Sequence, residues 1–238
     1  MTREFRVVIE GQNHTVVISD ETEALLAARA AGKASVGLWR KDGDQDLSAT
    51  GYVIESMEDA DQEYLEQVVR RKLGLPWLIA ETERLRIREF QPGDETRIPK
   101  EADETEADRA FHSPRLLREY IRYQYGFYGY GIWAVTEKKS GIVVGKAGLA
   151  NLTWDMDVPE GVELGYHIFA PYRRRGYGME ACRGILSWYQ GRMDCRLYAK
   201  TDASNKASVS LLEKSGFSVI DRKYIGEGRW HCLYEWNC

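Results

Sequence analysis

One stretch of twenty residues, 162–181, constrains the fold of this chain more than any other part. It reads VELGYHIFAPYRRRGYGMEA. Its first eight residues are rich in β-branched and aromatic side chains and predict a strand at 162–169. Pro171 ends that strand, because proline has no amide hydrogen for a sheet ladder. From Tyr177 onward apolar residues recur at three- and four-residue steps, which predicts a helix.

The loop between this strand and this helix is basic and contains two glycines. Its residues, in order, are Arg173, Arg174, Arg175, Gly176, Tyr177 and Gly178. Glycine lets a backbone come close to a ligand, and the first amides of a helix lack internal partners and lie at the positive end of its dipole. The loop is therefore suited to a phosphate or pyrophosphate group. The alternative is that the glycines only form a turn and that the arginines are a solvated corner.

The order of these residues resembles the coenzyme A pyrophosphate loop of the GNAT superfamily of N-acetyltransferases. The pattern is Arg-x-x-Gly-x-Gly at 173–178, after an apolar strand. The longer string, Glu-Leu-Gly-Tyr followed by Gly-Tyr-Gly-x-Glu-Ala, is similar to the branch that acetylates protein N-termini, the ribosomal-protein-alanine acetyltransferases of the RimJ/RimL type. The resemblance covers residues 79–237, about two thirds of the chain.

The resemblance implies an α+β fold with acetyl-CoA as cofactor. The expected GNAT fold has a mixed, mostly antiparallel twisted sheet flanked by helices, which opens between its fourth and fifth strands to hold the cofactor. Apolar patterns predict the other elements in a matching order: a strand at 81–90, a helix at 114–128, a hairpin at 131–152, a strand at 196–200, a helix at 203–215 and a hairpin at 217–236. The charged segment 101–109 predicts an exposed loop or helix end.

The resemblance also implies which residues contact coenzyme A, besides the loop 173–178. Main-chain groups around Ile168 and Phe169 would pair with the pantetheine arm, and one amide there would polarise the thioester carbonyl. Asn205 and Ser208 lie in DASNKASVSLLEKSGF, which resembles a family segment whose Asn contacts pantetheine and whose Ser lies near the thiol. The alternative is that Ser204 or Asn205 only caps a helix.

Two residues are candidates for catalysis, Glu163 and Ser208. Relatives with a glutamate on this strand use it to draw the proton from the amine, often through water, and partial burial of Glu163 would raise its pKa towards a useful range. The alternative is a structural carboxylate that binds an arginine or a backbone amide. Leu212 stands where many members have a tyrosine that protonates the leaving thiolate, so solvent or Ser208 would have to assist.

Residues 1–78 predict a small α/β domain that precedes the acetyltransferase domain at 79–238. Predicted strands at 5–9, 15–18, 35–39 and 52–54 alternate with predicted helices at 24–31 and 60–73, which indicates a parallel layer. Two pieces, ISDETEALLAARAAGKASVGLW and DLSATGYVIESM, are similar to the C-terminal part of haloacid-dehalogenase-type phosphatases.

That second resemblance is partial. The Asp-x-Asp nucleophile motif and the lysine segment of those phosphatases are absent, and Ala24 stands where a second acid would follow Asp20. We expect a degenerate, non-catalytic docking or regulatory domain, with a convergent βαβ piece or a phosphatase as the alternatives. Residues 1–80 hold 9 Lys and Arg against 14 Asp and Glu, so an acidic surface for a basic partner is a further hypothesis.

Composition excludes several classes of protein. The net charge of −4 lacks the excess of positive charge that general nucleic-acid binding needs. No apolar run approaches the roughly 18 residues of a membrane span. The N-terminus lacks the apolar core and cleavage site of a signal peptide. The four cysteines lack Cys-x-x-Cys spacing, and His231 and Cys232 lack further ligands, so we expect reduced thiols, no metal and a cytoplasmic location.

The leading functional hypothesis is an acetyl-CoA-dependent N-acetyltransferase that works by direct attack in a ternary complex. Its acceptor would be a primary amine, either a protein or peptide N-terminus or a small molecule. A non-catalytic acyl-CoA-binding regulatory or interaction protein is the alternative, and a homodimer stays open. Candidates for the acceptor pocket, which core or rim packing would also explain, are His112, Tyr123, Tyr125, Tyr128, Tyr130 and Trp154.

Overall fold

The computed structural model describes residues 1–41, 43–101, 106–154 and 158–237. The chain forms two compact units. The first consists of Met1–Trp77, Gln91–Glu95 and Arg109–Gly129, and the second of Leu78–Phe90, Thr96–Asp108 and Tyr130–Cys238. Segments 91–95 and 109–129 therefore belong to the first compact unit, although a division of the sequence after residue 78 assigns them to the C-terminal part.

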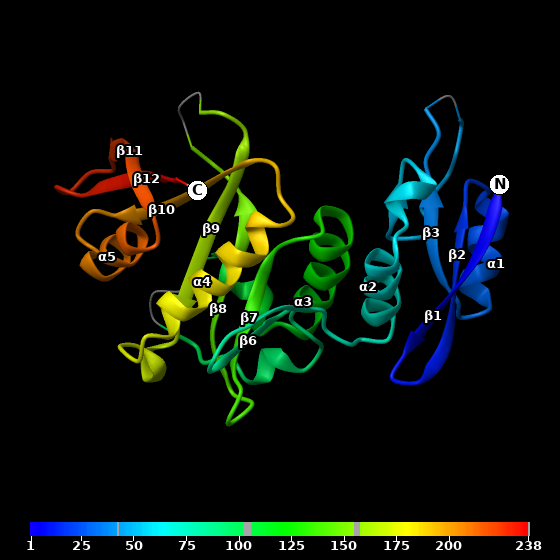
Figure 1. Cartoon of the computed structure of the whole chain (residues 1–238), viewed down its shortest axis with the longest axis horizontal. Helices are drawn as coiled ribbons and strands as arrows, with labels where there is room; N and C mark the ends of the chain where they lie inside the picture. The colour runs from blue at the N-terminus through cyan, green and yellow to red at the C-terminus, as the bar shows by residue number, and fades with distance from the viewer. Residues whose placement is uncertain (42, 102–105, 155–157, 238) are drawn as a thin grey trace. The chain divides into compact units, whose positions relative to one another are not determined.

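The first unit contains a four-stranded sheet in the order β1-β2-β3-β4 (Figure 1). Its strands are β1 (Thr2–Ile9), β2 (Gln12–Ser19), β3 (Ala34–Leu38) and β4 (Val53–Ile54). Strands β2, β3 and β4 are parallel, as predicted, but β1 and β2 are antiparallel. The reason is the two-residue turn of Glu10 and Gly11, with φ of 50° and 79°, because so short a turn can join only antiparallel strands.

Two helices complete this layer, α1 (Thr22–Ala30) and α2 (Gln62–Lys72), with a short 3₁₀ turn, η1 (Met57–Asp59), before α2. Helix α2 begins where the Asp61 side chain accepts a hydrogen bond from the Tyr64 amide at 2.7 Å. Apolar residues of α2 pack on the sheet, and the fully buried members of this core include Val7, Ile18, Val36, Leu65 and Val68.

The predicted helix at 114–128 has two parts. Helix α3 (Pro114–Tyr120) follows the Ser113 cap, and from Ile121 the backbone continues as a π-helix, η4 (Ile121–Tyr128). The Tyr125 ring is fully buried and packs edge-on against Tyr120, with 5.4 Å between the ring centroids. On the same segment, a Cβ at Gly126 would lie 3.3 Å from the Gly51 carbonyl oxygen and 3.5 Å from the Tyr52 ring.

This close approach predicts that Gly126→Val destabilises the protein. The γ-carbons of valine would have to displace backbone, so we expect a loss of about 1–3 kcal/mol in the free energy of unfolding, measured by urea denaturation. The matched control is Gly51→Ala, because a Cβ there meets only the Arg122 Nε atom, at 3.9 Å. Equal midpoints for Gly126→Val and the wild type would contradict the packing of η4 described above.

The second unit contains an eight-stranded sheet in the order β11-β12-β10-β9-β8-β7-β6-β5. Its strands are β5 (Leu78–Glu81), β6 (Leu85–Arg88), β7 (Ile132–Glu137), β8 (Val143–Asn151), β9 (Gly161–Ile168), β10 (Arg196–Asp202), β11 (Phe217–Tyr224) and β12 (Trp230–Trp236). The strand predicted at 81–90 is confirmed only in part, because β6 covers Leu85–Arg88 and Glu81 belongs to β5. The Leu85 amide donates to the Thr82 hydroxyl at 3.0 Å, and this turn folds the segment into the hairpin β5–β6.

The sheet opens between β9 and β10, as the predicted fold requires. Strand β9 pairs with β8 over residues 162–168, whereas it pairs with β10, in parallel, only over residues 161–163. The other neighbouring strands among the described residues are antiparallel. Beyond Glu163 the edge of β9 that faces β10 is therefore without a partner strand.

Helices α4 (Tyr177–Gln190) and α5 (Lys206–Lys214) follow β9 and β10 (Figure 1). Helix α4 buries one apolar face that includes Ala181, Cys182 and Ile185, which confirms the periodicity seen in the sequence. The remaining 3₁₀ turns are η2 (Asp94–Thr96), η3 (Glu106–His112) and η5 (Ala170–Tyr172). No helix formed by the described residues combines the length and apolar character that a membrane crossing needs.

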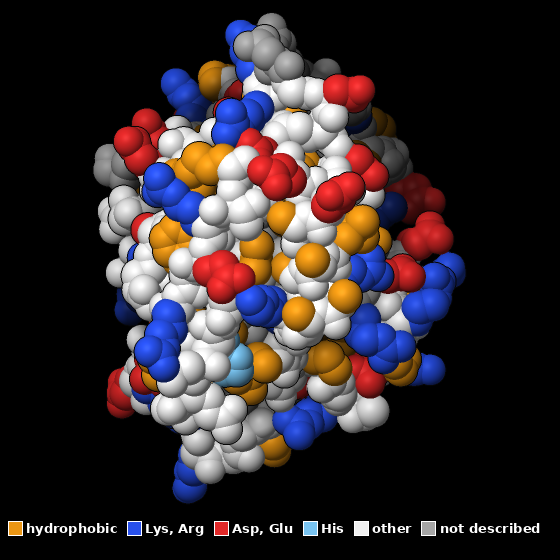
Figure 2. Space-filling view, turned by 90° about the vertical axis from the view of Figure 1, so that its right-hand side faces the viewer, with side chains coloured by type: hydrophobic (Ala, Val, Ile, Leu, Met, Phe, Trp, Pro, Cys, Tyr) orange, Lys and Arg blue, Asp and Glu red, His pale blue; other side chains and the backbone are white. Residues whose placement is uncertain are grey.

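Figure 2 shows the side of the molecule that lies at the right of Figure 1. Lys and Arg side chains are interspersed with Asp and Glu side chains there, with small groups of apolar side chains between them. The excess of acidic residues in the first part of the chain therefore does not form one continuous acidic surface on this face.

Candidate active site

A groove of about 620 Å³ lies where β9 ends and α4 begins. It is lined by the end of β9, by the loop that follows and by α5, through Tyr166, His167, Ile168, Tyr172, Arg173, Arg174, Gly176, Tyr177, Gly178, Met179, Asn205, Ala207, Ser208, Ser210, Leu211 and Lys214. Its volume is within the range of about 300–1,000 Å³ that is usual for cofactor and ligand sites.

Most of the residues that the sequence predicts for cofactor binding line this groove. They are Ile168, Arg173, Arg174, Gly176, Tyr177, Gly178, Asn205 and Ser208. Phe169 is 2% exposed and lies in the core. Phe169 and Arg175 are not among the groove-lining residues, and neither is Glu163. Sequence reasoning did not single out Tyr166 or Lys214, which do line it.

Hydrogen bonds between β8 and β9 decide which backbone groups face the opening. The Phe169 amide, directly after β9, donates to the Val144 carbonyl oxygen at 3.0 Å, so Phe169 continues the series of alternate residues that bond to β8. In an antiparallel pair such residues alternate with residues whose backbone groups point to the other side. The backbone groups of Ile168 and Tyr166 therefore point to the open side of β9. The Ile168 carbonyl there already accepts a hydrogen bond from Arg173 Nε at 2.8 Å.

Residues at the start of α4 line this groove. Gly176 is the N-cap residue, with φ of 82°, and no side chain caps the helix there. Arg174 also has a positive φ, of 62°. A Cβ at Gly178 would lie 3.2 Å from the Leu211 side chain and 3.6 Å from Ile168, so glycine keeps this part of the groove open.

Two of the three loop arginines bind within the protein. The Arg175 guanidinium donates to the Pro171 carbonyl at 3.0 Å, and that of Arg173 to the Ile168 carbonyl and to the Glu101 carboxylate, the latter at 3.3 Å. Arg174 lines the groove. Because two of the three guanidinium groups are already bonded within the protein, the backbone amides of the loop are better suited than these two side chains to bind an anion.

Glu101 is a site residue that sequence reasoning missed, because the charged segment 101–109 predicts exposure. Its side chain is only 10% exposed, contacts His167 Nε2 and accepts a hydrogen bond from the Ala170 amide at 2.7 Å. Burial opposes its ionisation, but the bonds from His167 and Ala170 and the charge of Arg173 outweigh burial and lower the pKa of Glu101. The prediction of exposure is therefore wrong at this residue; residues 102–105 lie outside the described part of the chain.

The start of α5 combines helix capping with the groove. The Asn205 side-chain oxygen accepts a hydrogen bond from the Ser208 amide at 3.2 Å, so Asn205 caps the helix, and both residues also line the groove. The Tyr166 hydroxyl donates to the Ser208 carbonyl at 3.4 Å. Leu212 is completely buried, so no proton donor occupies its position.

Glu163 lies at the last position where β9 and β10 pair, opposite Tyr198. Because strand side chains alternate, it projects from the face opposite Tyr166 and Ile168. Its side chain is 19% exposed, and one carboxylate oxygen lies 2.8 Å from Lys200 Nζ. Burial raises the pKa of Glu163, while the hydrogen bond and the charge of Lys200 lower it, and the net shift is upward.

Lys200 connects Glu163 to a second hollow, of about 340 Å³. This hollow is lined by Thr153, Trp154, Lys200, Thr201, Lys223, Ile225 and His231. Lys200 Nζ also donates to the Thr153 carbonyl at 3.0 Å, and Trp154 Nε1 donates to Asp221 at 2.7 Å. Both walls of the hollow are thus held by side-chain hydrogen bonds.

The six residues proposed from the sequence for an acceptor pocket are divided between the two compact units. Trp154 lines the second hollow, and the Tyr130 hydroxyl donates to Asn151 at 2.8 Å. Tyr125 is buried, as packing predicts. Tyr125 belongs to the first unit together with Tyr123 and Tyr128, which are exposed, and His112, which ends η3.

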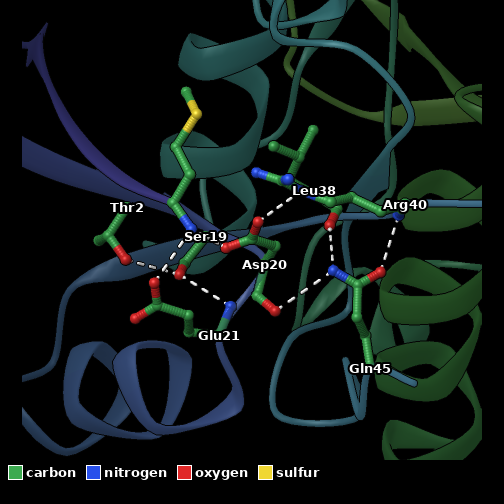
Figure 3. Close-up of polar contacts among 8 residues, drawn as sticks. Thr2, Ser19, Asp20, Glu21, Leu38, Arg40 and Gln45 are labelled. Carbon is green, nitrogen blue, oxygen red and sulfur yellow. Dashed lines mark hydrogen bonds and ion pairs between the residues drawn. The ribbon is translucent and has the colours of Figure 1, made fainter. Parts of the chain in front are cut away.

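In the first unit, hydrogen bonds and ion pairs join the residues at the carboxyl ends of β2 and β3 (Figure 3). The two oxygens of the Asp20 carboxylate bind the N-terminal amine and Arg40 Nε, the latter at 2.5 Å. Gln45 donates to the Asp20 and Leu38 carbonyls at 3.3 and 3.1 Å and accepts from the Arg40 amide at 2.7 Å. Ligands of α/β sheets commonly bind at this end of the strands; here the Asp20 carboxylate is held by two cationic groups.

Neither unit shows a metal centre within its described residues. No group of three or more His, Cys, Asp or Glu side chains there is arranged to hold a metal ion. His231 and Cys232, adjacent in sequence, point to opposite faces of β12 because strand side chains alternate.

A family profile described as "Acetyltransferase (GNAT) domain" matches residues 84–218, more than half of the chain. The chain belongs to the GNAT acetyltransferase family. The match covers the strand, loop and helix that form the groove and the helix α5 beside it. The protein is therefore an acetyltransferase, and its acetyl donor is acetyl-CoA.

Known GNAT proteins resemble the chain at moderate to low identity. The uncharacterized N-acetyltransferase YjdG of Bacillus subtilis is 27% identical over 121 residues, which are 50% of this chain and 70% of YjdG. A putative GNAT-family acetyltransferase from Bordetella pertussis has a similar structure, with a TM-score of 0.52 and 23% identity over 66% of this chain and 98% of its own. The ribosomal-protein-S5-alanine acetyltransferase of Vibrio fischeri also has a TM-score of 0.52, with 19% identity over 65% and 93% of the two chains. At these identities the two solved structures are evidence for the fold.

The groove of this GNAT protein fits the diphosphate end of acetyl-CoA. The uncapped amides at the start of α4 can donate to phosphate oxygens, and Gly178 leaves the space that a side chain would fill. Arg174 and Lys214 add two cationic side chains to the lining. The open side of β9 at Ile168 and Tyr166 leaves a strand edge beside which the pantetheine arm can lie.

Proposed function

We propose that this GNAT enzyme acetylates a primary amine and that Glu163 is its base. The observation that carries the proposal is a half-buried carboxylate with a raised pKa at the point where β9 and β10 separate. A glutamate whose pKa lies nearer to neutrality accepts a proton more readily than an exposed one. We call residues 173–178 the diphosphate loop. The open edge of β9 runs from this loop back towards Glu163, so a pantetheine arm extended along this edge would lead to the base.

The chemistry requires a neutral amine, because an ammonium ion has no lone pair. Bound acetyl-CoA supplies the thioester carbon that is attacked and the thiol that leaves. Glu163, directly or through one water, takes the proton of the attacking nitrogen as the C–N bond forms. Ser208 lines the groove and is our candidate to hydrogen-bond the departing sulfur as the C–S bond breaks, since the buried Leu212 has no proton to give.

We assign the acceptor to the second hollow, because Lys200 lines it and also contacts Glu163. The acceptor is a peptide N-terminus or a small amine. The motif at 162–181 favours the branch that acetylates N-termini, and it is the reason to test peptides first. The Vibrio fischeri enzyme, named for alanine acetylation of ribosomal protein S5, shares the fold, and the choice of acceptor is left to experiment.

A non-catalytic acyl-CoA-binding regulator is the second candidate. Two observations favour it: the Glu163 carboxylate is already paired with Lys200, and Leu212 supplies no acid for the leaving thiolate. In this case the groove binds acyl-CoA, and binding changes an interaction of the protein instead of leading to turnover.

We propose further that residues 1–78 are a non-catalytic docking or regulatory domain, a degenerate relative of haloacid-dehalogenase-type phosphatases. The ion pairs of Asp20 support this assignment, since a carboxylate held by Arg40 is poorly placed to act as a phosphatase acid. The protein is expected to show no hydrolysis of p-nitrophenyl phosphate with Mg²⁺. Hydrolysis that is lost in Asp20→Asn would overturn this assignment.

The function is tested by titrating the full chain with acetyl-CoA in a calorimeter and then measuring thiol release with a panel of peptides and small amines. Binding with turnover on one class of acceptor supports the enzyme and identifies its substrate. The regulator is favoured if the wild type binds acetyl-CoA without turnover on any amine and if Glu163→Gln binds acetyl-CoA with the same affinity. Sedimentation of the same preparation tests the homodimer.

A further inference from the structure

The junction of the diphosphate loop and α4 is held by a side chain from the β5–β6 turn. Arg84 Nε and NH2 contact one Glu180 oxygen at 2.7 and 2.6 Å, and Arg84 NH1 donates to the Arg175 carbonyl at 2.9 Å. The Arg84 guanidinium also lies over the Tyr177 ring, 4.8 Å from its centroid. One guanidinium therefore contacts the loop backbone, the first residue of α4 and a carboxylate in its first turn.

The Glu180 carboxylate is bonded to the β5–β6 turn. Its side chain is 15% exposed and accepts hydrogen bonds from the Thr82 hydroxyl at 2.6 Å and from the Arg84 amide at 2.7 Å. Burial opposes its ionisation, but the bonds from Thr82 and Arg84 and the charge of Arg84 outweigh burial and lower the pKa of Glu180. The carboxylate is thus charged at neutral pH, and each of its oxygens accepts from the turn.

Arg84 also fits closely against the N-cap of α4. A Cβ built at Gly176 would lie 3.2 Å from Arg84 NH2, so the guanidinium rests directly against the backbone there. The N-cap has no side chain of its own to orient the first amides. The planar fork of arginine presents its donors at fixed angles, which a flexible lysine does not. Arg84, which is not part of α4, thus restrains the backbone at the start of this helix, as the side chain of an N-cap residue usually does.

We propose that Arg84 is a positioning residue for the diphosphate of coenzyme A, acting through the backbone of residues 175–177. Arg84 is not among the residues that line the groove, so it acts on the ligand only through the loop. A loop held in its binding conformation before the ligand arrives loses less conformational entropy on binding. The amides that face the groove keep their directions because Arg84 and Glu180 join them to the β5–β6 hairpin.

The test compares a ligand that has the diphosphate with one that lacks it. Calorimetry with coenzyme A and with pantetheine is carried out on wild type, Arg84→Ala and Arg84→Lys. We expect Arg84→Ala to weaken coenzyme A binding about 10- to 100-fold and to change pantetheine binding less than about twofold. Arg84→Lys keeps a charge beside Glu180 but cannot also donate to the Arg175 carbonyl, so we expect an intermediate loss for coenzyme A alone.

Arg86→Ala is the matched control. Arg86 lies two residues further along the same hairpin and also binds a glutamate, Glu81, at 2.5 Å, but this pair is exposed and is not one of the contacts described above to residues 175–177 and Glu180. It should bind both ligands as the wild type does. If Arg84→Ala is unstable, Arg84→Lys alone decides the test. The proposal is overturned if Arg84→Lys binds coenzyme A with wild-type affinity, or if coenzyme A and pantetheine weaken by the same factor.

Discussion

The Glu163→Gln variant is expected to acetylate its amine about 10²- to 10⁴-fold more slowly than the wild type. Glutamine has nearly the shape of glutamate but cannot take the proton from the attacking nitrogen. Lys200 keeps its hydrogen bonds to the Thr153 carbonyl and hydroxyl, at 3.0 and 3.1 Å, so the second hollow should retain its shape. Coenzyme A affinity should change less than about twofold, because Glu163 does not line the groove.

The pH dependence gives a second readout of the same substitution. Glu163 must be ionised to act as a base, so wild-type kcat/KM should fall as pH drops through the pKa of this carboxyl. Burial places that pKa above the ordinary value of 4.5, with Lys200 opposing the rise. The acidic limb should therefore lie above pH 4.5 in the wild type and disappear in Glu163→Gln.

Glu235→Gln is the matched control for this experiment. Glu235 lies on β12 opposite Tyr198, is 22% exposed and binds Arg196 at 2.5 Å. It is thus a half-buried, ion-paired carboxylate of the same sheet that lines neither hollow. We expect wild-type turnover and an unchanged acidic limb. A wild-type pH profile in Glu163→Gln, or equal losses in the two variants, would remove Glu163 from the mechanism.

The Gly178→Val variant is expected to lose coenzyme A binding by about 10-fold or more. A Cβ at this position already lies 3.2 Å from the Leu211 side chain, and the two γ-carbons of valine would extend either into the groove or against α5. We expect the loop backbone to bind the diphosphate, so crowding it at residue 178 should weaken binding. Calorimetric titration with coenzyme A measures the loss.

Gly191→Val is the matched control, because Gly191 ends the same helix and a Cβ there meets nothing within 4 Å. Both variants should be titrated well below their melting temperatures, since overpacking at residue 178 also costs about 1–3 kcal/mol of stability. We expect Gly191→Val to bind as the wild type does. Wild-type affinity in a folded Gly178→Val protein would show that the diphosphate does not bind at the start of α4.

Local patterns were sufficient for the centre of the site. The strand predicted at 162–169 is β9, at Gly161–Ile168, and the helix predicted from Tyr177 is α4. Both predictions are confirmed. These elements were predictable because the periodicity of a strand or a helix depends on residues close in sequence, and because a proline and glycines mark where the strand ends and the helix begins. The family motif overlaps these same residues, which is why the fold and the cofactor were predictable together.

Contacts between distant residues were not predictable in this way. Glu101 belongs to a charged segment whose composition predicts exposure, yet the Ala170 amide, 69 residues away, bonds to it. Arg84 and Glu180, 96 residues apart, bond to each other beside residues 175–177. Glu180 belongs to the Gly-Tyr-Gly-x-Glu-Ala string, but nothing in the sequence pairs it with Arg84. The pairing of Glu163 with Lys200 also required the structure, because it depends on the register of β9 against β10.

The sequence by itself determined the family, the strand, loop and helix around the groove where we expect the cofactor, and the glycines in that loop. Each of these rests on short-range properties: side-chain periodicity, backbone freedom and helix ends. Only the tertiary structure decided which loop arginines line the groove, which carboxylate pairs with which cation, and that segment 109–129 packs in the first compact unit. These outcomes depend on strand order and register, which bring together residues far apart in the chain and which no local pattern encodes.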